Sequence, residues 1–226
     1  MIINRQKFHD GYRATWGSLR ASQVMAIEHL LTKFDASVLF DRLSKIACTF
    51  GNIKTETGDL YTPCREGNYL HGDFASQLRQ LYNYYSSHNR GALKTIFPNG
   101  LDEIINFIGR GEVQTTHDYN YMKFFKAIKY QFGVDIMKEP DKMMDDDISF
   151  MVMELGLNVR EYSYTGKILS DYFNDNTEDY SLEKRFIGYR NMVGYLITPR
   201  RTINGKDKYQ LIGNDSIKFY NILEFE

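Results

Sequence analysis

Apolar residues recur at intervals of three or four along almost the whole chain, and this spacing constrains the fold more than any other feature. The clearest example is one apolar face formed by Val24, Ile27, Leu31 and Phe34. A helix with such a face must bury it against another element, so repeated amphipathic helices predict a core built between helices. The chain has only four prolines, so few of these segments are interrupted. The sequence therefore predicts a mainly α fold.

The same spacing predicts where the helices lie. They are expected at residues 24–34, 38–50, 74–85, 101–108, 122–128 and 148–155, and further helices at 166–173, 182–192 and 215–223. The acidic run 145–147 precedes one of them, and negative charge favours a helix N-terminus, so we expect a helix flank there rather than a metal site. Strand alternation is scarce outside 59–70 and 195–209, which predicts a small hairpin region between the second and third helices.

Length and charge limit the class of protein. A chain of 226 residues is near the upper end of what one hydrophobic core organises, so we expect a single, two-lobed domain over residues 1–226. The composition, 42% hydrophobic and 25% charged, argues against a disordered tail. Lys and Arg total 28 against 29 for Asp and Glu, a balance that argues against a strongly basic nucleic-acid binder.

Membrane insertion and metal binding have little support. The longest charge-free runs, such as residues 191–199, fall far short of the roughly 18 apolar residues that a membrane span needs. The first residues lack an apolar signal-peptide core, so we expect a protein made in the cytoplasm. Cys48 and Cys64 are too few for a disulfide scaffold and lack metal-ligand spacing. We expect buried thiols, no metal and no cofactor.

Two glutamates flank one predicted turn. Glu56 ends an apolar helix and is followed by Gly58, and Glu66 lies in the non-helical run beyond the turn. Hydrolysis of a glycosidic bond uses such a pair, one carboxyl kept protonated by an apolar setting and the other ionised to polarise water. Two glutamates ten residues apart are more often solvated surface groups, and the spacing alone leaves that alternative open.

Two further stretches do not fit a plain helical bundle. Gly109-Arg110-Gly111 lets the backbone bend sharply and approach a ligand, but it matches neither the phosphate loop nor the dinucleotide-binding pattern. A tight turn with a surface arginine explains that spacing equally well. Asn204-Gly205, just before the last predicted helix, is a signal for a tight hairpin turn and means little alone.

Taken together and in this order, the three stretches resemble glycoside hydrolase family 19, which holds plant-type chitinases and phage lysins with a lysozyme-like fold. The family's most specific stretch, Gly-Arg-Gly-x-x-Gln-Leu/Ile-Thr/Ser followed by Asn-Tyr, is matched by residues 109–116 and 120–121, with Thr115 as the departure. The first catalytic region of the phage members, His-Glu-Ser/Thr-Gly, is matched by residues 55–58, where Thr55 replaces the histidine. The late Ile-Ile-Asn-Gly is matched by residues 202–205. The resemblance spans residues 8–224, with an apparent insertion near 182–198.

The resemblance implies a two-lobed, lysozyme-like α+β domain with a central catalytic cleft and inverting hydrolysis of a β-1,4 link. Glu56 would be the general acid and Glu66 the general base, with the carboxyls roughly 6.5 to 9.5 Å apart so that water fits between. Thr116 would help to hold that water, and Arg110 would brace the carboxylates and loops. The implied substrate-binding residues are Gln114, Asn120, Asn204, Tyr69 and Tyr121, the two tyrosines as platforms for sugar stacking.

Chitin and peptidoglycan share a β-1,4-linked N-acetylated backbone, so the motifs do not separate them. The opening segment, with Tyr12-Arg13 and Ser22-Gln23-Val24, resembles the lead-in helix of the phage lysins. This segment, the small size and the lack of a chitin-binding module favour peptidoglycan, cut between N-acetylmuramic acid and N-acetylglucosamine. The expected partner is the glycan strand, with no nucleic acid and no membrane insertion. A holin, or delivery within a virion, would bring the protein from the host cytoplasm to the cell wall. The alternatives are a chitinase and a catalytically silent glycan-binding or virion structural domain, the last favoured by Thr55 and Thr115.

Overall fold

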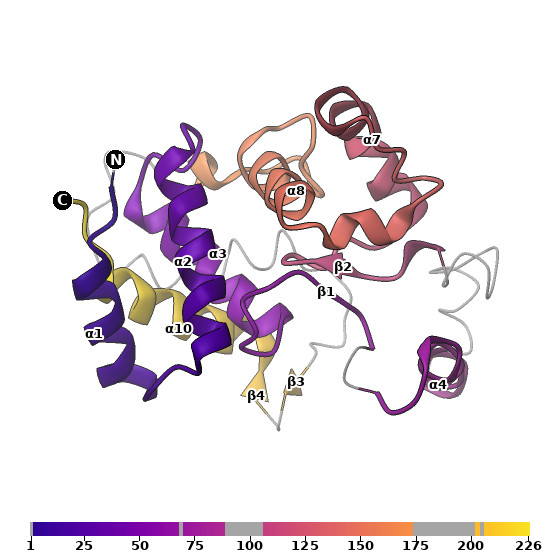
Figure 1. Ribbon diagram of the computed structural model, residues 1–226, viewed down its shortest axis with the longest axis horizontal. Helices are drawn as coiled ribbons and strands as arrows, with labels where there is room; N and C mark the ends of the chain where they lie inside the picture. The colour runs from indigo at the N-terminus through magenta and orange to yellow at the C-terminus, as the bar shows by residue number, and fades with distance from the viewer. Residues whose placement is uncertain (1, 68–69, 89–105, 174–201, 204–205) are drawn as a thin grey trace. The chain divides into compact units, whose positions relative to one another are not determined.

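The computed structural model describes residues 2–67, 70–88, 106–173, 202–203 and 206–226 (Figure 1). The chain divides into two compact units. Unit 1 spans Met1–Tyr61 and Met153–Glu226, and unit 2 spans Thr62–Val152. The described ranges contain seven α-helices and two very small two-stranded sheets, so the predicted mainly α class is confirmed.

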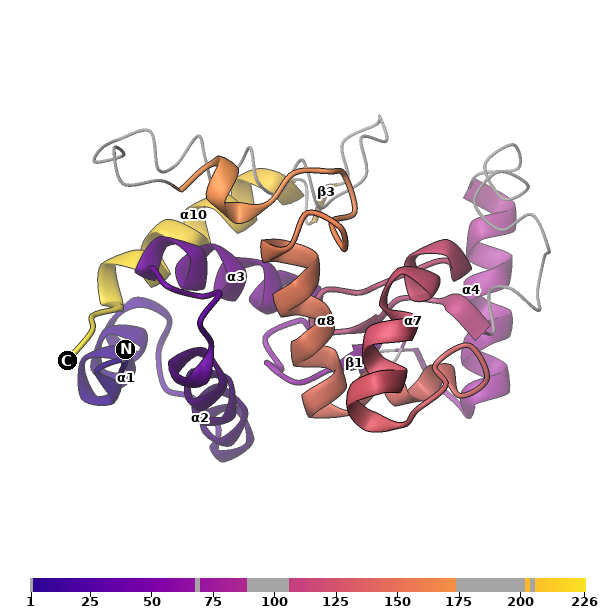
Figure 2. The ribbon, with the colours of Figure 1, turned by 90° about the horizontal axis from the view of Figure 1, so that it is seen from above.

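Unit 1 is built from helices that come from both ends of the chain. They are α1 (Arg5–Trp16), α2 (Ala21–Ala36), α3 (Leu43–Glu56) and α10 (Lys208–Ile222). α3 and α10 lie side by side (Figures 1 and 2). Their shared core is aromatic: the Phe50 ring lies 5.3 Å from Phe8 and 5.1 Å from Phe219, measured between centroids. All three rings are buried.

Close approach of α3 to α10 requires a glycine. A Cβ atom on Gly51 would clash with the Ser216 hydroxyl and would lie 2.9 Å from the Ile212 carbonyl oxygen. A larger residue would therefore push the two helices apart. Because Glu56 ends α3 and Lys208 begins α10, this packing also fixes where both side chains emerge.

Unit 2 combines two helices with a two-residue strand pair. Its elements are β1 (Cys64–Arg65), α4 (Phe74–His88), β2 (Arg110–Gly111), α7 (Asp118–Phe132), the 3-10 helix η1 (Pro140–Met144) and the first half of α8 (Asp146–Asn158). α7 ends at Gly133, whose φ of 71° is a left-handed conformation that suits glycine. The chain passes back into unit 1 within α8.

Several predicted elements have different bounds or partners in the structure. The hairpin region expected after the second predicted helix is wrong as a local hairpin, because β1 pairs with β2 from much later in the chain. A local antiparallel pair does form at β3 (Thr202–Ile203) and β4 (Lys206–Asp207), within the strand alternation expected at 195–209 and on either side of the Asn204-Gly205 turn signal. The last helix begins at Lys208, earlier than expected.

The helix predicted at 166–173 is wrong. Only a 3-10 turn, η2 (Leu169–Asp171), forms there. Gly166 has a φ of 78°, and the Asp171 carboxylate accepts a hydrogen bond from the Ile168 backbone N–H at 2.9 Å, so local side-chain bonds replace helical ones. The helix predicted at 182–192, and most of that at 101–108, lie outside the described residues.

Both cysteines are buried free thiols, as expected. Among the described residues, none of the helices has the length and apolar character required to cross a membrane.

Candidate active site

The β1–β2 pair brings Glu66 next to Gly109. Cys64 is paired with Gly111 and Arg65 with Arg110, so the next residue on β1 falls opposite the residue before β2. The Glu66 backbone N–H donates to the Gly109 carbonyl at 2.7 Å. The Gly109 N–H lies 3.4 Å from Glu66 Oε2, a long hydrogen bond that holds the carboxylate near the backbone. Two short strands thereby fix a half-buried carboxylate.

Gln114 and Thr116 converge on the same glycine. A Cβ atom placed on Gly109 would lie 2.8 Å from Gln114 Oε1 and 3.2 Å from Thr116 Oγ1. Only a residue without a side chain lets the amide and the hydroxyl come so close to this backbone. Glu66, Gln114 and Thr116 therefore all lie close to the Gly109 backbone in unit 2.

The loop after β2 holds Gln114 in a defined orientation. Gln114 has a φ of 53°, and its Nε2 donates to the carbonyl of Cys64 at 2.8 Å and of Gly111 at 2.9 Å. Thr116 Oγ1 donates to the Gln114 carbonyl at 3.0 Å. The amide nitrogen of Gln114 is thus committed to the protein, while its oxygen faces the Gly109 backbone.

Arg110 is a buried brace. Its side chain is 1% exposed, and its Nε donates to Asp141 at 2.8 Å. Its Nη1 donates to the Asn106 carbonyl at 2.9 Å and to the Tyr121 hydroxyl at 3.1 Å. These bonds join β2, the segment before it, α7 and η1. Arg110 is therefore a buried residue that joins these segments, and the alternative of a surface arginine is wrong.

Asn120 and Tyr121 lie on the buried face of α7. The Asn120 Nδ2 donates to the Thr116 carbonyl at 2.7 Å. Tyr121 is fully buried, its hydroxyl donates to the Ile108 carbonyl at 3.1 Å, and burial raises its pKa to about 12 despite the neighbouring Arg110. As placed, both side chains hold the 109–116 loop against α7, and the Tyr121 ring presents no face to solvent. Tyr69 and Asn204, also predicted to bind substrate, lie outside the described residues.

Sequence reasoning gave no role to Glu112 inside the same loop. Its side chain is buried and contacts the Ser149 hydroxyl on α8, which in turn accepts the Glu112 backbone N–H at 3.0 Å. Gly111, with a φ of 83°, permits this packing, since a Cβ there would lie 2.6 Å from Ser149 Oγ. The only sequence feature that could have pointed to Glu112 is its charge, since it lies inside the stretch that matches the family motif.

The other predicted carboxylate, Glu56, belongs to unit 1. It is the last residue of α3, and its side chain is 10% exposed. Its Oε2 accepts a hydrogen bond from Lys208 Nζ at 2.9 Å, and Lys208 is itself 13% exposed. The sequence predicted an apolar setting that keeps this carboxyl protonated. The burial is present, but the setting includes an ammonium, which stabilises the ionised form.

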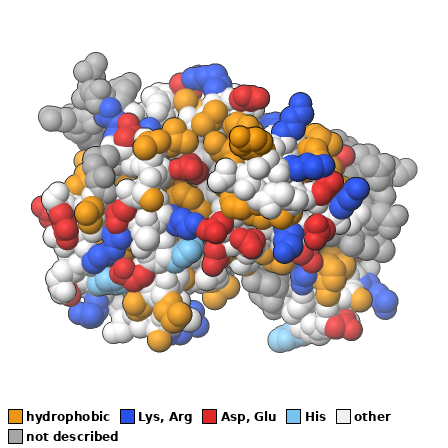
Figure 3. Space-filling view, turned by 45° about the horizontal axis from the view of Figure 1, so that its top comes forward, with side chains coloured by type: hydrophobic (Ala, Val, Ile, Leu, Met, Phe, Trp, Pro, Cys, Tyr) orange, Lys and Arg blue, Asp and Glu red, His pale blue; other side chains and the backbone are white. Residues whose placement is uncertain are grey.

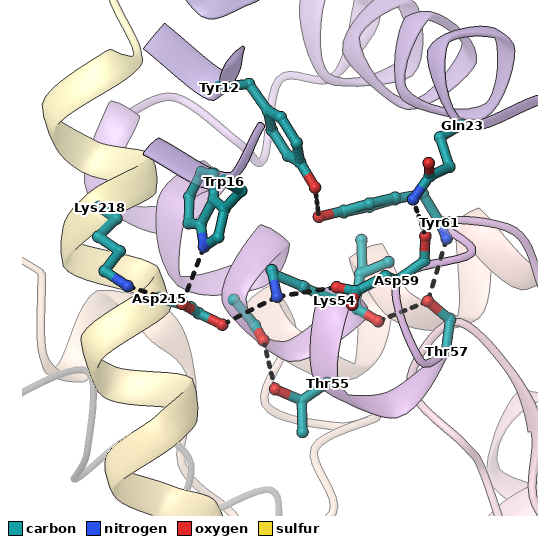
Figure 4. A network of polar contacts seen from close by, with 12 residues as sticks. Tyr12, Trp16, Gln23, Lys54, Thr55, Thr57, Asp59, Tyr61, Asp215 and Lys218 are labelled. Atoms are coloured by element: carbon teal, nitrogen blue, oxygen red, sulfur yellow. Dashed lines mark hydrogen bonds and ion pairs between the residues drawn. The ribbon is translucent and has the colours of Figure 1, made fainter. Parts of the chain in front are cut away.

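The turn after Glu56 is held by a polar network (Figure 4). Lys54 Nζ bridges Asp59 at 2.8 Å and Asp215 at 3.3 Å. Burial opposes the charge on Lys54, but the bonds to these two carboxylates outweigh it and raise its pKa. Trp16 Nε1 donates to Asp215 at 3.3 Å. The network ties the end of α3 to both α1 and α10.

The backbone of this turn adopts uncommon conformations. Asp59 and Tyr61 have φ values of 66° and 60°, both left-handed. Gln23 Nε2 donates to the Asp59 carbonyl at 2.8 Å, and the Tyr61 N–H donates to Thr57 Oγ1 at 3.1 Å (Figure 4). The Tyr61 and Tyr12 hydroxyls lie 2.9 Å apart. Contacts from α1 and α2 therefore hold the turn that follows Glu56.

Comparison of the chain with protein-family models, with curated proteins and with solved structures gave no match.

Proposed function

We propose that this chain is a peptidoglycan-degrading glycoside hydrolase, a muramidase of the phage endolysin type. It would cleave the β-1,4 link between N-acetylmuramic acid and N-acetylglucosamine with inversion. The observation that carries the proposal is the convergence of Glu66, Gln114 and Thr116 on Gly109, because an inverting hydrolase needs a carboxylate that activates water, and a hydroxyl near it can help to hold that water.

In this proposal Glu66 is the general base. Its carboxylate would take a proton from the attacking water while Thr116 positions that water, since a hydroxyl can donate and accept at once. Gln114 would offer its amide oxygen to a sugar hydroxyl or acetamido N–H. Arg110 takes no proton step, because its guanidinium stays charged.

Glu56 would be the general acid. It must carry a proton to give to the leaving oxygen, yet its carboxylate accepts a hydrogen bond from Lys208. The proposal therefore includes a proton taken up by Glu56 before bond cleavage. Because the pair is largely buried, proton uptake by Glu56 should become easier when its contact with Lys208 is weakened.

The same ion pair favours the second candidate, a glycan-binding domain without catalytic activity. A carboxyl group that accepts a hydrogen bond from an ammonium is a poor proton donor, and Thr55 stands where the phage lysins have histidine. Such a domain would bind the glycan strand and release no sugar ends.

Hydrolysis of purified Gram-negative sacculi, measured as new reducing ends, tests the proposal. Glu66→Gln and Glu56→Gln should each lower the rate by about 10²- to 10⁴-fold, because each removes one proton-transfer group and keeps the side-chain shape. Glu139→Gln is the matched control, since Glu139 is an exposed glutamate of unit 2, and it should retain the wild-type rate. Sacculi bound without any new ends would support the silent domain and overturn the hydrolase.

Product analysis tests the bond that is cut. After borohydride reduction, mass spectrometry should find reduced N-acetylmuramic acid at the new ends. Reduced N-acetylglucosamine at every new end would show that the protein is a glucosaminidase instead. Faster release of reducing ends from chitin oligomers than from sacculi would show that it is a chitinase.

A further inference from the structure

The solvent-facing side of α7 carries large apolar side chains. Residues 119, 122, 126 and 130 follow one another at helical spacing, on the side opposite the buried Asn120, Tyr121, Phe124 and Ile128. Exposure is 55% at Tyr119, 54% at Met122 and 92% at Tyr130. We call the five residues Tyr119, Met122, Lys126, Lys129 and Tyr130 the α7 outer face.

One ring of this face is already fixed in place. Tyr119 stacks on His117, with centroids 5.2 Å apart and planes inclined by 7°. His117 is itself buried, so it holds the Tyr119 ring from below. A ring held in this way loses little freedom when a ligand packs on it, which favours binding.

Positive charge predominates on this side of α7. Lys126 is exposed and Lys129 is 57% exposed, while Asp118 begins the helix and the Asp135 carboxylate lies 4.0 Å from Lys129 Nζ. Lys129 Nζ lies over the Phe125 ring at 5.1 Å, so its methylene stem adds apolar surface while its charge stays in water. Figure 3 shows one face of the molecule, on which basic and acidic side chains lie among hydrophobic ones. The chain as a whole has a net charge of −1, so this concentration of positive charge is local.

We propose that the α7 outer face binds the acidic stem peptides of the peptidoglycan strand. This inference rests on the proposed function, which places the chain on that polymer. Stem peptides carry free carboxylates beside short aliphatic side chains. The lysines of the α7 outer face would pair with the carboxylates, and its tyrosines and methionine would pack against the aliphatic side chains. Chitin has no such carboxylates or aliphatic side chains. The α7 outer face would therefore make the enzyme prefer peptidoglycan, a preference that the motifs around Gly109 do not supply.

Co-sedimentation of the full chain with sacculi tests this inference. The Glu66→Gln background keeps the substrate intact during the measurement. Lys126→Glu/Lys129→Glu should raise the Kd for intact sacculi by about tenfold, because attraction to an anionic polymer becomes repulsion. Lys138→Glu/Lys167→Glu, at two exposed lysines elsewhere, makes the same change in net charge and should leave the Kd within about twofold. Tyr130→Ser should weaken binding without any change in charge.

Sacculi stripped of stem peptides by an amidase give the decisive comparison. On this substrate the parent and the α7 double variant should bind equally weakly. A tenfold difference that persists on stripped strands would overturn the proposal, and so would equal binding of both proteins to intact sacculi. Loss of binding to phosphatidylglycerol vesicles but not to sacculi would assign the face to a membrane surface instead. Binding that depends on the stem peptides with no sugar ends released by the wild-type chain would refute the hydrolase and leave this inference standing.

Discussion

At the scale of single residues, the key side chains of each unit are held by partners that are distant in sequence. Glu56 and Lys208 are 152 residues apart, and Glu112 and Ser149 are 37 apart. Each of these charged or polar groups is largely buried, where a lost partner costs more than it would at the surface. Substitutions at these positions therefore test both the stability and the chemistry of the site.

Lys208→Met should destabilise unit 1, because it removes the ammonium from which a mostly buried carboxylate accepts a hydrogen bond. We expect a loss of about 1 to 3 kcal/mol in the free energy of unfolding at pH 7, measured by urea denaturation. Glu56→Gln combined with Lys208→Met should recover much of that loss, since no carboxylate is left to compensate. If the double variant loses as much free energy of unfolding as the two single variants lose together, the two side chains are not coupled.

Arg110→Lys tests whether the several hydrogen-bond donors of the guanidinium group, rather than its charge, stabilise the site. A single ammonium cannot reach Asp141, the Asn106 carbonyl and the Tyr121 hydroxyl together. We expect about 2 to 3 kcal/mol of destabilisation in urea, with loss of hydrolysis. Arg79→Lys, at an exposed position of α4, should change stability by less than about 0.5 kcal/mol. Equal stability of the two variants would contradict the bracing role.

The resemblance to glycoside hydrolase family 19 pointed to site residues whose positions depend on the local backbone. Glu66, Gln114 and Thr116 lie on short segments around one glycine, and the structure brings them together there. Lys208 was missed, because no periodicity links the start of α10 to the end of α3. Its contact with Glu56 exists only once the two helices have packed.

At the scale of elements, a glycine determines how closely the loop after β2 approaches the backbone just before β2. Gly109→Ala would place a Cβ 2.8 Å from Gln114 Oε1 and 3.2 Å from Thr116 Oγ1, so both side chains must move. Its φ is not in the left-handed region, and alanine there should change the thermal midpoint little. We expect hydrolysis to fall by at least about tenfold, because small misplacements of reacting groups are costly. Wild-type turnover would show that Gln114 and Thr116 need not be held this closely.

The length of each element and the sequence distance between its partners explain which elements could be predicted from the sequence. α2, α3, α4, α7 and α8 each show an apolar face at helical spacing, and each overlaps a predicted helix, although α3 begins five residues later and ends six residues later than expected. β1 and β2 have two residues each, too few for alternation to be visible, and their pairing is non-local. At residues 166–173 the apolar spacing was present, but Ser163 Oγ donates to the Lys167 carbonyl and Asp171 accepts from the Ile168 N–H, and these local hydrogen bonds compete with a helix.

At the scale of the whole molecule, the chain is expected as a single domain and the structure resolves it into two compact units, one of them discontinuous. Composition predicted enough apolar residues for a large core but gave no boundary, because unit 1 takes residues from both ends of the chain. Both units bury tyrosines close to their candidate site residues: Tyr12 and Tyr61 in unit 1, Tyr121 in unit 2. These phenols give the molecule a common dependence on pH.

Stability should fall in alkaline solution. Burial is the largest cause that raises the pKa of Tyr12, Tyr61 and Tyr121, the last to about 12, and carboxylate partners raise the pKa of Lys54. The folded state therefore holds these protons more tightly than the unfolded chain does. Their contribution is complete below pH of about 10 and is lost as the pH rises beyond it.

Urea denaturation followed by circular dichroism at pH 7, 9, 10 and 11 measures this loss. Each phenol that stays protonated only in the folded state adds about 1.4 kcal/mol per pH unit to the decline above pH of about 10. Tyr61→Phe should lower stability by about 1 kcal/mol at pH 7, through the lost hydrogen bond with Tyr12, and should make the alkaline decline shallower. Tyr130→Phe, at a ring that is 92% exposed, should leave the decline as steep as in the wild type. If Tyr61→Phe declines as steeply as Tyr130→Phe, ionisation of the buried phenol does not drive the alkaline loss, and the charge of Lys54 or a general repulsion between carboxylates must account for it.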